Sequence, residues 1–395
     1  MGRARTTLIV AVAAQAAVSI VQFGMPAIEP QIRSHLQIGP AGFGAVFAAI
    51  GLGSAMVLIP VGILVDRFGA RPVLFGGALL NAAGYLAAAS TSNAWAFAGG
   101  VFLAGVGSAA VPVAGMSSLI RAFPPEKRGI VLGWRQLAVP MGGTIGAIML
   151  PLLAHAGGVR LALLCAAAAT TITTAWFAVL SRGEGGTAGK LSLDGVLTAP
   201  GMRPLLCVAL LYAFPLSAAL TYLVPAARSA GQTAALAGIA FTVLNLSAAA
   251  SRLVWGRLAD RHGGTRRTRV LATSGSLTTV AALLAPAAMS FGPVTALVVV
   301  LGLGFGAFGF NGVLYVTAGE LVGADRAARA VGVASTVVFG ATSLAAPLAG
   351  LVAEHLGYDA MWLFAAVSAA GGVAVAARVL PRARRAGQVA AAAQA

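Results

Sequence analysis

Long runs of apolar residues, separated by short polar breaks, dominate this chain. Apolar residues fill 59% of its 395 positions and charged residues only 9%, whereas a soluble domain carries about 25% charged residues. The mean hydropathy is +0.91. Because a membrane-spanning helix needs about 20 apolar residues in succession, each run predicts one span. We predict twelve spans, at 7–29, 41–64, 72–91, 95–120, 129–153, 160–180, 204–227, 235–258, 269–289, 293–319, 328–353 and 359–380.

The longest polar break divides these spans into two sets of six. It covers residues 182–203 and is rich in glycine. We therefore predict an all-α membrane protein built of two six-helix bundles, residues 1–181 and 204–385. The break is a cytoplasmic linker in this prediction, and residues 386–395 form a disordered tail.

Charge adds topology to this picture. The formal net charge is +16, which in a soluble protein would suggest nucleic-acid binding. Here most of the 26 lysines and arginines fall in alternate loops, on the cytoplasmic side if the N-terminus is cytoplasmic. This is the positive-inside pattern. It predicts a multi-pass protein of the bacterial cytoplasmic (inner) membrane with both termini in the cytoplasm, in contact with membrane lipids and not with nucleic acid.

Catalytic and cofactor signatures do not stand out. There is no Gly-x-x-x-x-Gly-Lys-Ser/Thr loop for a nucleotide. The two cysteines, Cys165 and Cys207, lie inside apolar spans, and four scattered histidines fit no metal-ligand spacing. We expect a protein that is not an enzyme, that has no cofactor or metal, and that is a monomer.

One loop motif occurs twice. Residues 62–69 read Gly-Ile-Leu-Val-Asp-Arg-Phe-Gly, and residues 256–263 read Gly-Arg-Leu-Ala-Asp-Arg-His-Gly. Each copy follows an apolar run, after predicted spans 2 and 8, and the copies start about half the chain apart. Internal repeats of this kind are typical of secondary transporters.

The doubled motif, the twelve spans and the central linker together resemble the major facilitator superfamily over essentially the whole chain. Two further stretches are similar to cyanate-permease-like members. They are residues 123–143, with Trp134-Arg135-Gln136 and Val139-Pro140-Met141-Gly142-Gly143, and Phe310-Asn311-Gly312. The resemblance implies a fold more than a cargo, because that branch is mostly without assigned substrates.

The resemblance also implies a gate on the cytoplasmic side. Asp66 would act as a latch toward span 11, and Gly62 and Gly69 would permit a close helix approach and a tight turn. The alternative is a basic turn that only fixes topology. The candidate gating residues are Gly62, Asp66, Arg67, Gly69, Arg71, Gly256, Asp260 and Arg261.

Two arginines lie within spans. An intramembrane arginine is costly, and it suggests a functional site facing a cavity. The alternative for Arg135 in span 5 and Arg252 in span 8 is snorkelling, in which the long side chain reaches the membrane surface. For Arg252 we favour function, because monocarboxylate transporter-like and oxalate transporter-like proteins meet the substrate carboxylate with an arginine at this place.

Other polar side chains within the spans are candidates to contact a substrate. They are Gln15, Gln22, Gln136, Tyr212, Tyr222, Asn245, Asn311 and Tyr315. The resemblance implies that spans 1, 4, 7 and 10 line the cavity. The alternative role for each is an interhelical hydrogen bond, worth about 0.6 kcal/mol on average.

These observations favour a secondary active transporter that moves a small organic solute by alternating access. Positive charge exceeds negative charge within the spans, and no carboxylate lies at their centres, so we expect an organic anion. A coupling proton or other ion is a further candidate partner. A drug or natural-product efflux pump is an alternative, although span 4 lacks the arginine of many proton-coupled members and Val139 stands where drug antiporters carry glycine. A transport-dead membrane sensor is the alternative of another class.

Overall fold

The computed structural model describes residues 2–123, 125–181, 195–260, 264–322 and 327–381. Some side chains within these ranges, among them Asp66, Gln136 and Asp260, lie outside the description. So do residues 182–194 of the predicted linker and the whole predicted tail. The chain divides into two compact units, Met1–Lys190 and Leu191–Ala395, and all of its described elements are helical.

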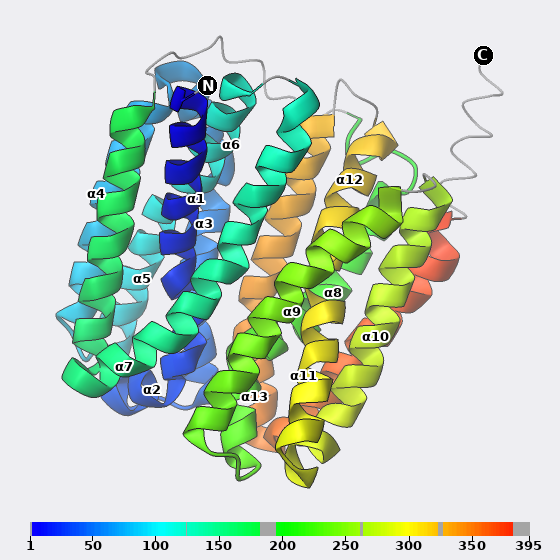
Figure 1. Cartoon of the computed structure of the whole chain (residues 1–395). Helices are drawn as coiled ribbons and strands as arrows, with labels where there is room; N and C mark the ends of the chain where they lie inside the picture. Colours follow the sequence, from blue (N-terminus) through cyan, green and yellow to red (C-terminus); the bar gives the residue numbers. More distant parts are fainter. Residues whose placement is uncertain (1, 124, 182–194, 261–263, 323–326, 382–395) are drawn as a thin grey trace. The chain divides into compact units, whose positions relative to one another are not determined.

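The first unit holds the helices coloured blue to green in Figure 1. They are α1 (Gly2–Gly24), the 3₁₀ turn η1 (Met25–Ile28), α2 (Glu29–Leu36), α3 (Pro40–Phe68), α4 (Ala70–Ala89), α5 (Ala94–Ser108), α6 (Ala110–Ala122) and α7 (Pro125–Leu180). Local sequence sets several ends. Asn93 caps α5 by accepting from the backbone N–H groups of Trp95 and Ala96, and proline opens α3 at the first helical position.

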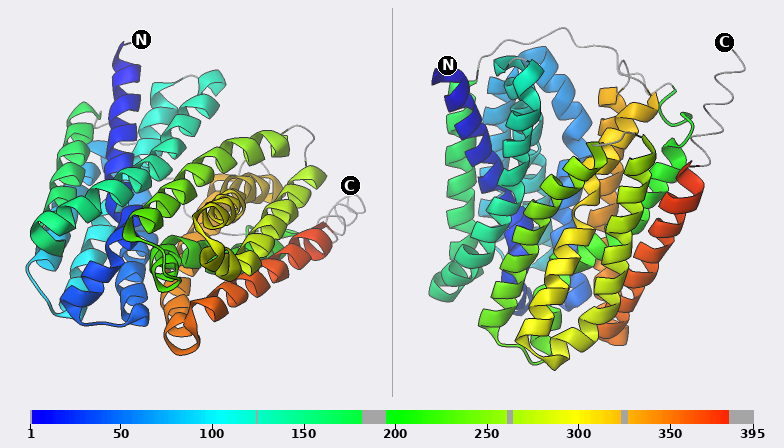
Figure 2. Two further views of the ribbon diagram at one scale, coloured as in Figure 1. Left: turned by 60° about the horizontal axis from the view of Figure 1, so that its bottom comes forward. Right: turned by 45° about the vertical axis from the view of Figure 1, so that its right-hand side comes forward.

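The second unit holds the helices coloured green to red. They are α8 (Met202–Ser229), α9 (Ala234–Asp260), α10 (Gly264–Phe291), α11 (Pro293–Ala307), α12 (Phe310–Val322), α13 (Ala327–Ala374) and the π-helical turn η3 (Val375–Val379). In this unit α8 packs against α13, and α10 packs against both α11 and α13. Figure 2 shows α10 beside α11 in both views.

Ten helical stretches in the described part of the chain are long and apolar enough to cross a membrane. Two of them, Leu137–Leu180 with 44 residues and Ala330–Arg378 with 49 residues, exceed one crossing. At 1.5 Å per residue each would be roughly 66 Å or longer, more than twice the hydrocarbon thickness. Each is interrupted by glycine in a non-helical conformation, at Gly157 and Gly158 in α7 and at Gly357 in α13.

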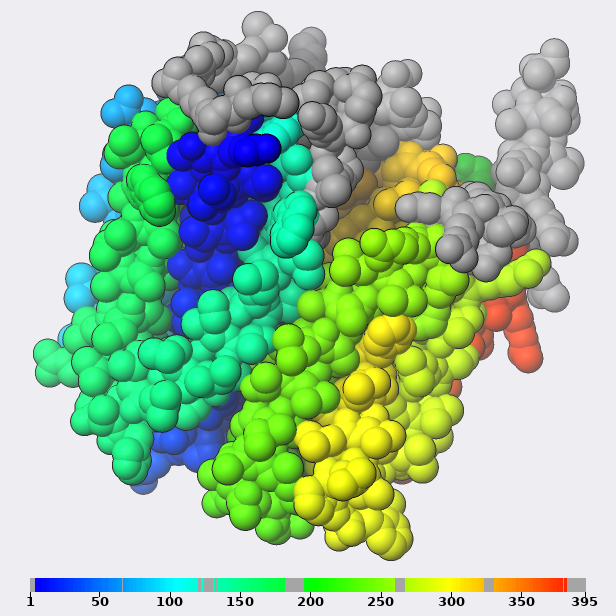
Figure 3. Space-filling model, viewed as in Figure 1, coloured from blue at the N-terminus to red at the C-terminus, as the bar shows by residue number. Residues whose placement is uncertain are grey.

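The outward faces of these helices are apolar. Leu79 on α4 is 71% exposed, Ile172 on α7 is 66% exposed and Val298 on α11 is 65% exposed. Figure 3 shows one such surface of the second unit, where α9 and α11 lie side by side. Exposed apolar area on this scale marks a surface that contacts lipid.

Glycine allows α4 and α5 to pack closely. A Cβ atom on Gly84 of α4 would overlap the backbone of Ala104, and one on Gly107 of α5 would overlap the backbone of Asn81. Gly100 meets the backbone at Ala88 in the same way. This contact is a small-residue interface of the kind that membrane helices use to approach each other.

In each unit one apolar span is broken into two helices. In the first unit the break separates α5 from α6, where Pro112 lacks the N–H that would continue the helix. In the second unit it separates α11 from α12, in a segment with Gly304, Gly306 and Gly309. Side chains of neighbouring helices bond the carbonyl groups just before each break. Asn81 donates to Ala104 O, Ser54 to Gly105 O, Trp255 to Phe305 O and Ser274 to Gly306 O.

Candidate functional site

The second unit brings two predicted site residues together with a serine. Arg252 lies on α9 and Tyr315 on α12, and the Arg252 charge lies within electrostatic range of the Tyr315 hydroxyl. Tyr315 shares a side-chain hydrogen bond with Ser335 of α13. All three side chains are only partly buried. We call Arg252, Tyr315 and Ser335 the Arg252 cluster.

Asn311 extends this cluster along α12. It precedes Tyr315 by four residues, which places both on one face of the helix. Its Oδ1 atom is buried and has no hydrogen-bond partner among the described residues. The cluster and its neighbour therefore offer a cation, a phenol, a hydroxyl and an amide, which together suit a small anion that also bears hydrogen-bonding groups.

The first unit holds Arg135 and Gln15 together. Arg135 on α7 is 4% exposed, and its Nη2 atom donates to Gln15 Oε1 of α1 and to Pro112 O of α6, each at 2.9 Å. The close packing of α1 on α7, visible in Figure 1, supplies this geometry. The side chain is directed into the unit, and the snorkelling interpretation of Arg135 is wrong for this structure.

The hydroxyl groups of the two tyrosines of α8 form hydrogen bonds with neighbouring helices. The Tyr212 hydroxyl donates to Leu271 O of α10 at 2.9 Å, and the ring meets Phe310 edge to face. The Tyr222 hydroxyl donates to Ala346 O of α13 at 2.9 Å. Both side chains are almost fully buried, so in this conformation their hydroxyls join helices.

The remaining predicted polar residues do not gather at one place. Asn245 is buried and donates from Nδ2 to Phe241 O of its own helix. Gln22 is partly buried on α1, seven residues after Gln15. The side chain of Gln136 lies outside the described residues.

The repeated loop motif is only partly described. Gly69 adopts φ 82° and ψ 168° between α3 and α4, a turn with positive φ that favours glycine. Arg67 and Arg71 are exposed, and the Cζ atom of Arg67 lies 5.2 Å from the ring centre of Phe68. The side chains of Asp66 and Asp260, and all of Arg261, lie outside the described residues.

Gly62 and Gly256 make no close helix contact within their own units. A Cβ atom at Gly62 would meet no described heavy atom within 4 Å, and the same holds at Gly256. Each helix is rotated about its axis so that its glycine faces open space. Contact through glycine occurs between α4 and α5, and also between α1 and α7 at Gly24 and Gly146.

Several chemical groups that lie at or near these sites were not predicted from the sequence. Pro112 contributes a backbone carbonyl, which has no sequence signature, and Ser335 is one of many small polar residues in apolar spans. The ion pair between Arg267 of α10 and Glu320 of α12, two residues far apart in the chain, was also not predicted. Glu29, almost fully buried, pairs with Arg33 one turn later at 3.1 Å, a spacing that sequence could have revealed.

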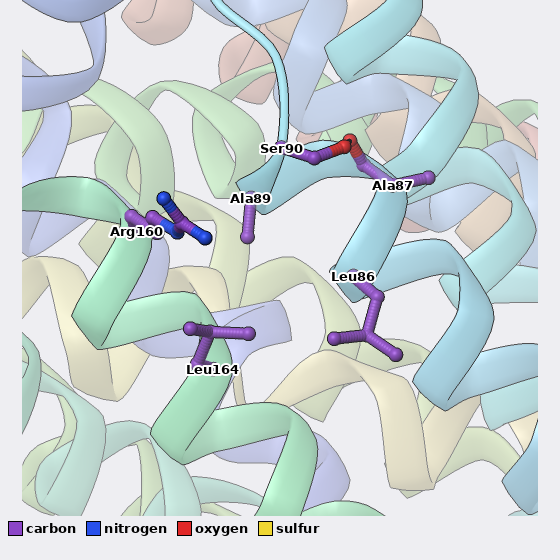
Figure 4. A pocket seen from close by; sticks show the side chains of 6 residues that line it. All are labelled: Leu86, Ala87, Ala89, Ser90, Arg160 and Leu164. Atoms are coloured by element: carbon purple, nitrogen blue, oxygen red, sulfur yellow. Dashed lines mark hydrogen bonds between the residues drawn. The ribbon is translucent and has the colours of Figure 1, made fainter.

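A shallow open pocket of about 400 Å³ lies away from these groups. Figure 4 shows Arg160 and Leu164 of α7 facing Leu86, Ala89 and Ser90 at the end of α4. None of the predicted substrate residues lines it. It lies at helix ends, and its polar lining residues are Ser90 and Arg160. We assign it no role in transport.

Comparison with known proteins gives these groups their context. The family model of the Major Facilitator Superfamily matches residues 7–346, with a second match over residues 205–395. The chain belongs to the major facilitator superfamily. Its helical, apolar architecture is that of a multi-pass membrane transport protein. Members of the superfamily are transporters and not enzymes, which agrees with the sequence prediction.

Individual relatives of this superfamily chain are distant. An uncharacterized MFS-type transporter of Mycobacterium tuberculosis (strain H37Rv) is 26% identical over 345 residues, covering 84% of this chain and 77% of the relative. The multidrug resistance protein MdtH of Salmonella paratyphi C is 28% identical over 135 residues, 33% of each chain. MdtH of Enterobacter sp. (strain 638) is 27% identical over 169 residues, 40% of this chain and 42% of the relative.

Proposed function

We propose that this superfamily member is a secondary active transporter of a small organic anion that works by alternating access. The Arg252 cluster is the observation that carries the proposal. Arg252 offers a planar fork for a carboxylate, and Tyr315 and Ser335 offer hydroxyls beside it. An arginine within a membrane span suggests a functional site, and an anionic solute would form a charge-assisted contact with this guanidinium.

The proposal includes a topology. The glycine interruptions at Gly157–Gly158 and Gly357 would divide the two longest stretches, so that ten apolar stretches become twelve spans in two bundles of six. Both termini would lie in the cytoplasm of a bacterium, with the protein a monomer in the inner membrane. The repeated motif, with Asp66 and Asp260, would close the cytoplasmic side.

Uptake into proteoliposomes tests the proposal. We expect the purified protein to accumulate at least one of radiolabelled lactate, oxalate or succinate, and the unlabelled anion to stimulate exchange when trapped inside. Liposomes without protein and a protein carrying Arg252→Ala are the controls. Equal signals from the parent protein and empty liposomes for all three anions would contradict anion transport.

A second candidate function is efflux of a drug-like molecule. The similarity to two proteins named as multidrug resistance proteins supports it, although each match covers less than half of this chain. Efflux of a lipophilic cation such as ethidium, unaffected by Arg252→Ala, would favour this candidate. A transport-dead sensor would bind one of these solutes and move none of them.

A further inference from the structure

Arg135 places a buried positive charge inside the first unit. Its side chain is 4% exposed, and both acceptors of its Nη2 atom, Gln15 Oε1 and Pro112 O, are neutral. Neutral acceptors orient a guanidinium but leave its charge uncompensated. Burying a charge without a counter-charge costs several kcal/mol.

No described acidic side chain of the first unit compensates this charge. Glu29 is the one acidic residue of this unit whose side chain the structure describes, and its Oε1 atom already pairs with Arg33. The Nε atom of Arg135 is buried and has no hydrogen-bond partner among the described residues. The guanidinium therefore keeps a donor available and a charge unmatched.

The residue of the neighbouring helix α6 that lies beside the Nε atom of this guanidinium is a glycine. This residue is Gly115, and a Cβ atom at Gly115 would lie 3.1 Å from Nε and 3.8 Å from Cδ and Cζ. Any larger residue would press on the guanidinium. Gly115 therefore adds no side chain at the Nε atom.

We infer that Arg135 is the anion contact of the first unit, taking a carboxylate of the transported solute on its unpaired Nε edge. Gln15 and the Pro112 carbonyl are positioning groups that hold the guanidinium by its Nη2 atom. This inference rests on the proposed function and deepens it, because it assigns a contact for the transported anion to a guanidinium of the first unit. Because both N–H groups of Nη2 already donate, the Nε atom offers the carboxylate one charge-assisted hydrogen bond.

Three variants test the assignment in uptake assays with radiolabelled lactate, oxalate and succinate. Arg135→Gln removes the charge, and its KM should rise on the order of 30-fold or more, the usual effect of truncating one partner of a buried charge pair. Gly115→Ala keeps the charge but crowds its free edge, and its KM should rise by a smaller factor. Arg160→Gln, which removes an exposed charge from the same helix, should leave KM unchanged.

A readout besides transport separates binding from a structural role. The anion that the parent transports should raise the thermal midpoint of the detergent-solubilised parent and of Arg160→Gln, and should fail to raise that of Arg135→Gln. Lactamide, a neutral analogue of lactate, should raise none of them. A structural cross-link predicts instead a lower midpoint without solute and an unchanged KM.

A failure of the Arg135 assignment can be distinguished from a failure of the proposed function. If the parent transports an anion and Arg135→Gln, still folded by size-exclusion chromatography, keeps its KM, the assignment of Arg135 is wrong and anion transport stands. If the parent neither transports nor is stabilised by any of the three anions, the proposed function and the role of Arg135 both fall.

Discussion

The side-chain amide of Asn81 donates to the carbonyl oxygen of Ala104 at 3.1 Å, one turn before α5 ends at Ser108. The same amide also donates to the Ser108 hydroxyl at 2.8 Å. In the second unit the Ser274 hydroxyl of α10 donates to Gly306 O at 2.7 Å, at the end of α11. In both units, then, the helix that precedes the broken span supports the backbone at the break.

Replacing Asn81 with leucine should destabilise this break. The loss of two interhelical hydrogen bonds in a membrane predicts a cost of about 1 kcal/mol, from an average near 0.6 kcal/mol for each. Thermal unfolding in detergent measures it, with Ser90→Ala as the control because Ser90 bonds only within its own turn. An unchanged midpoint for Asn81→Leu would mean that the break needs no support.

Three tyrosines allow one substitution to be compared at structural and functional positions. Tyr212→Phe and Tyr222→Phe each lose a bond to a backbone carbonyl, so each should lower stability by about 0.5–1.5 kcal/mol and leave KM nearly unchanged. Tyr315→Phe removes a hydroxyl of the Arg252 cluster and should raise KM severalfold. Thermal midpoints and uptake kinetics of the three variants provide the comparison, and identical profiles would refute the distinction.

Anion binding should weaken when residue 252 loses either its charge or its planar guanidinium group. Arg252→Lys keeps the charge but lacks the planar fork, so we expect weaker anion binding. Arg252→Ala should nearly abolish binding while the protein stays folded. Anion-induced thermal stabilisation of both variants measures this, and a fully active lysine variant would rule out the proposed carboxylate contact.

Neighbouring glycines of α5 should respond in opposite ways to the same change. Gly100→Ala would drive a methyl group into the backbone at Ala88, and overpacking of this kind costs about 1–3 kcal/mol. Gly99→Ala meets no described atom within 4 Å and should be neutral or slightly stabilising, because alanine favours helix more than glycine does. Thermal midpoints of the two variants decide the matter; equal losses would show that α4 and α5 can separate to admit the methyl group.

Asp66→Asn tests the proposed cytoplasmic latch. Removing the carboxylate should weaken closure, so turnover should fall more than affinity. Uptake kinetics separate the two quantities, and Arg160→Gln serves as the control for a change of charge at an exposed position of the same unit. If Asp66→Asn matches the parent in both kcat and KM, the motif only fixes topology.

Sequence patterns predicted the helical membrane fold well because runs of apolar residues have few other outcomes. The repeated motif and the long apolar stretches were enough to indicate the superfamily. Patterns could not tell the roles of Tyr212 and Tyr315 apart, because a sequence names a polar group without giving its direction. Direction depends on how each helix rotates in its packing, and Tyr212 turns toward α10 while Tyr315 turns toward Ser335 and Arg252.

The same limit applies to Arg135 and to Gly62. For Arg135, depth along the span allowed both burial and snorkelling, and the Pro112 carbonyl that helps to decide between them is invisible in a side-chain pattern. For Gly62, membership in a motif does not tell which way the helix faces, and within its own unit it faces open space. Packing details of this kind follow from three-dimensional neighbours that lie far away in the chain.

The two cysteines offer a practical handle on motion. Cys165 on α7 is exposed and Cys207 on α8 is partly exposed, and both are free thiols. Each unit thus carries one native attachment point for a spin label or a fluorophore, without any engineered residue. Double electron–electron resonance between two such labels, with and without solute, would report directly whether the distance between the two units changes when a solute binds.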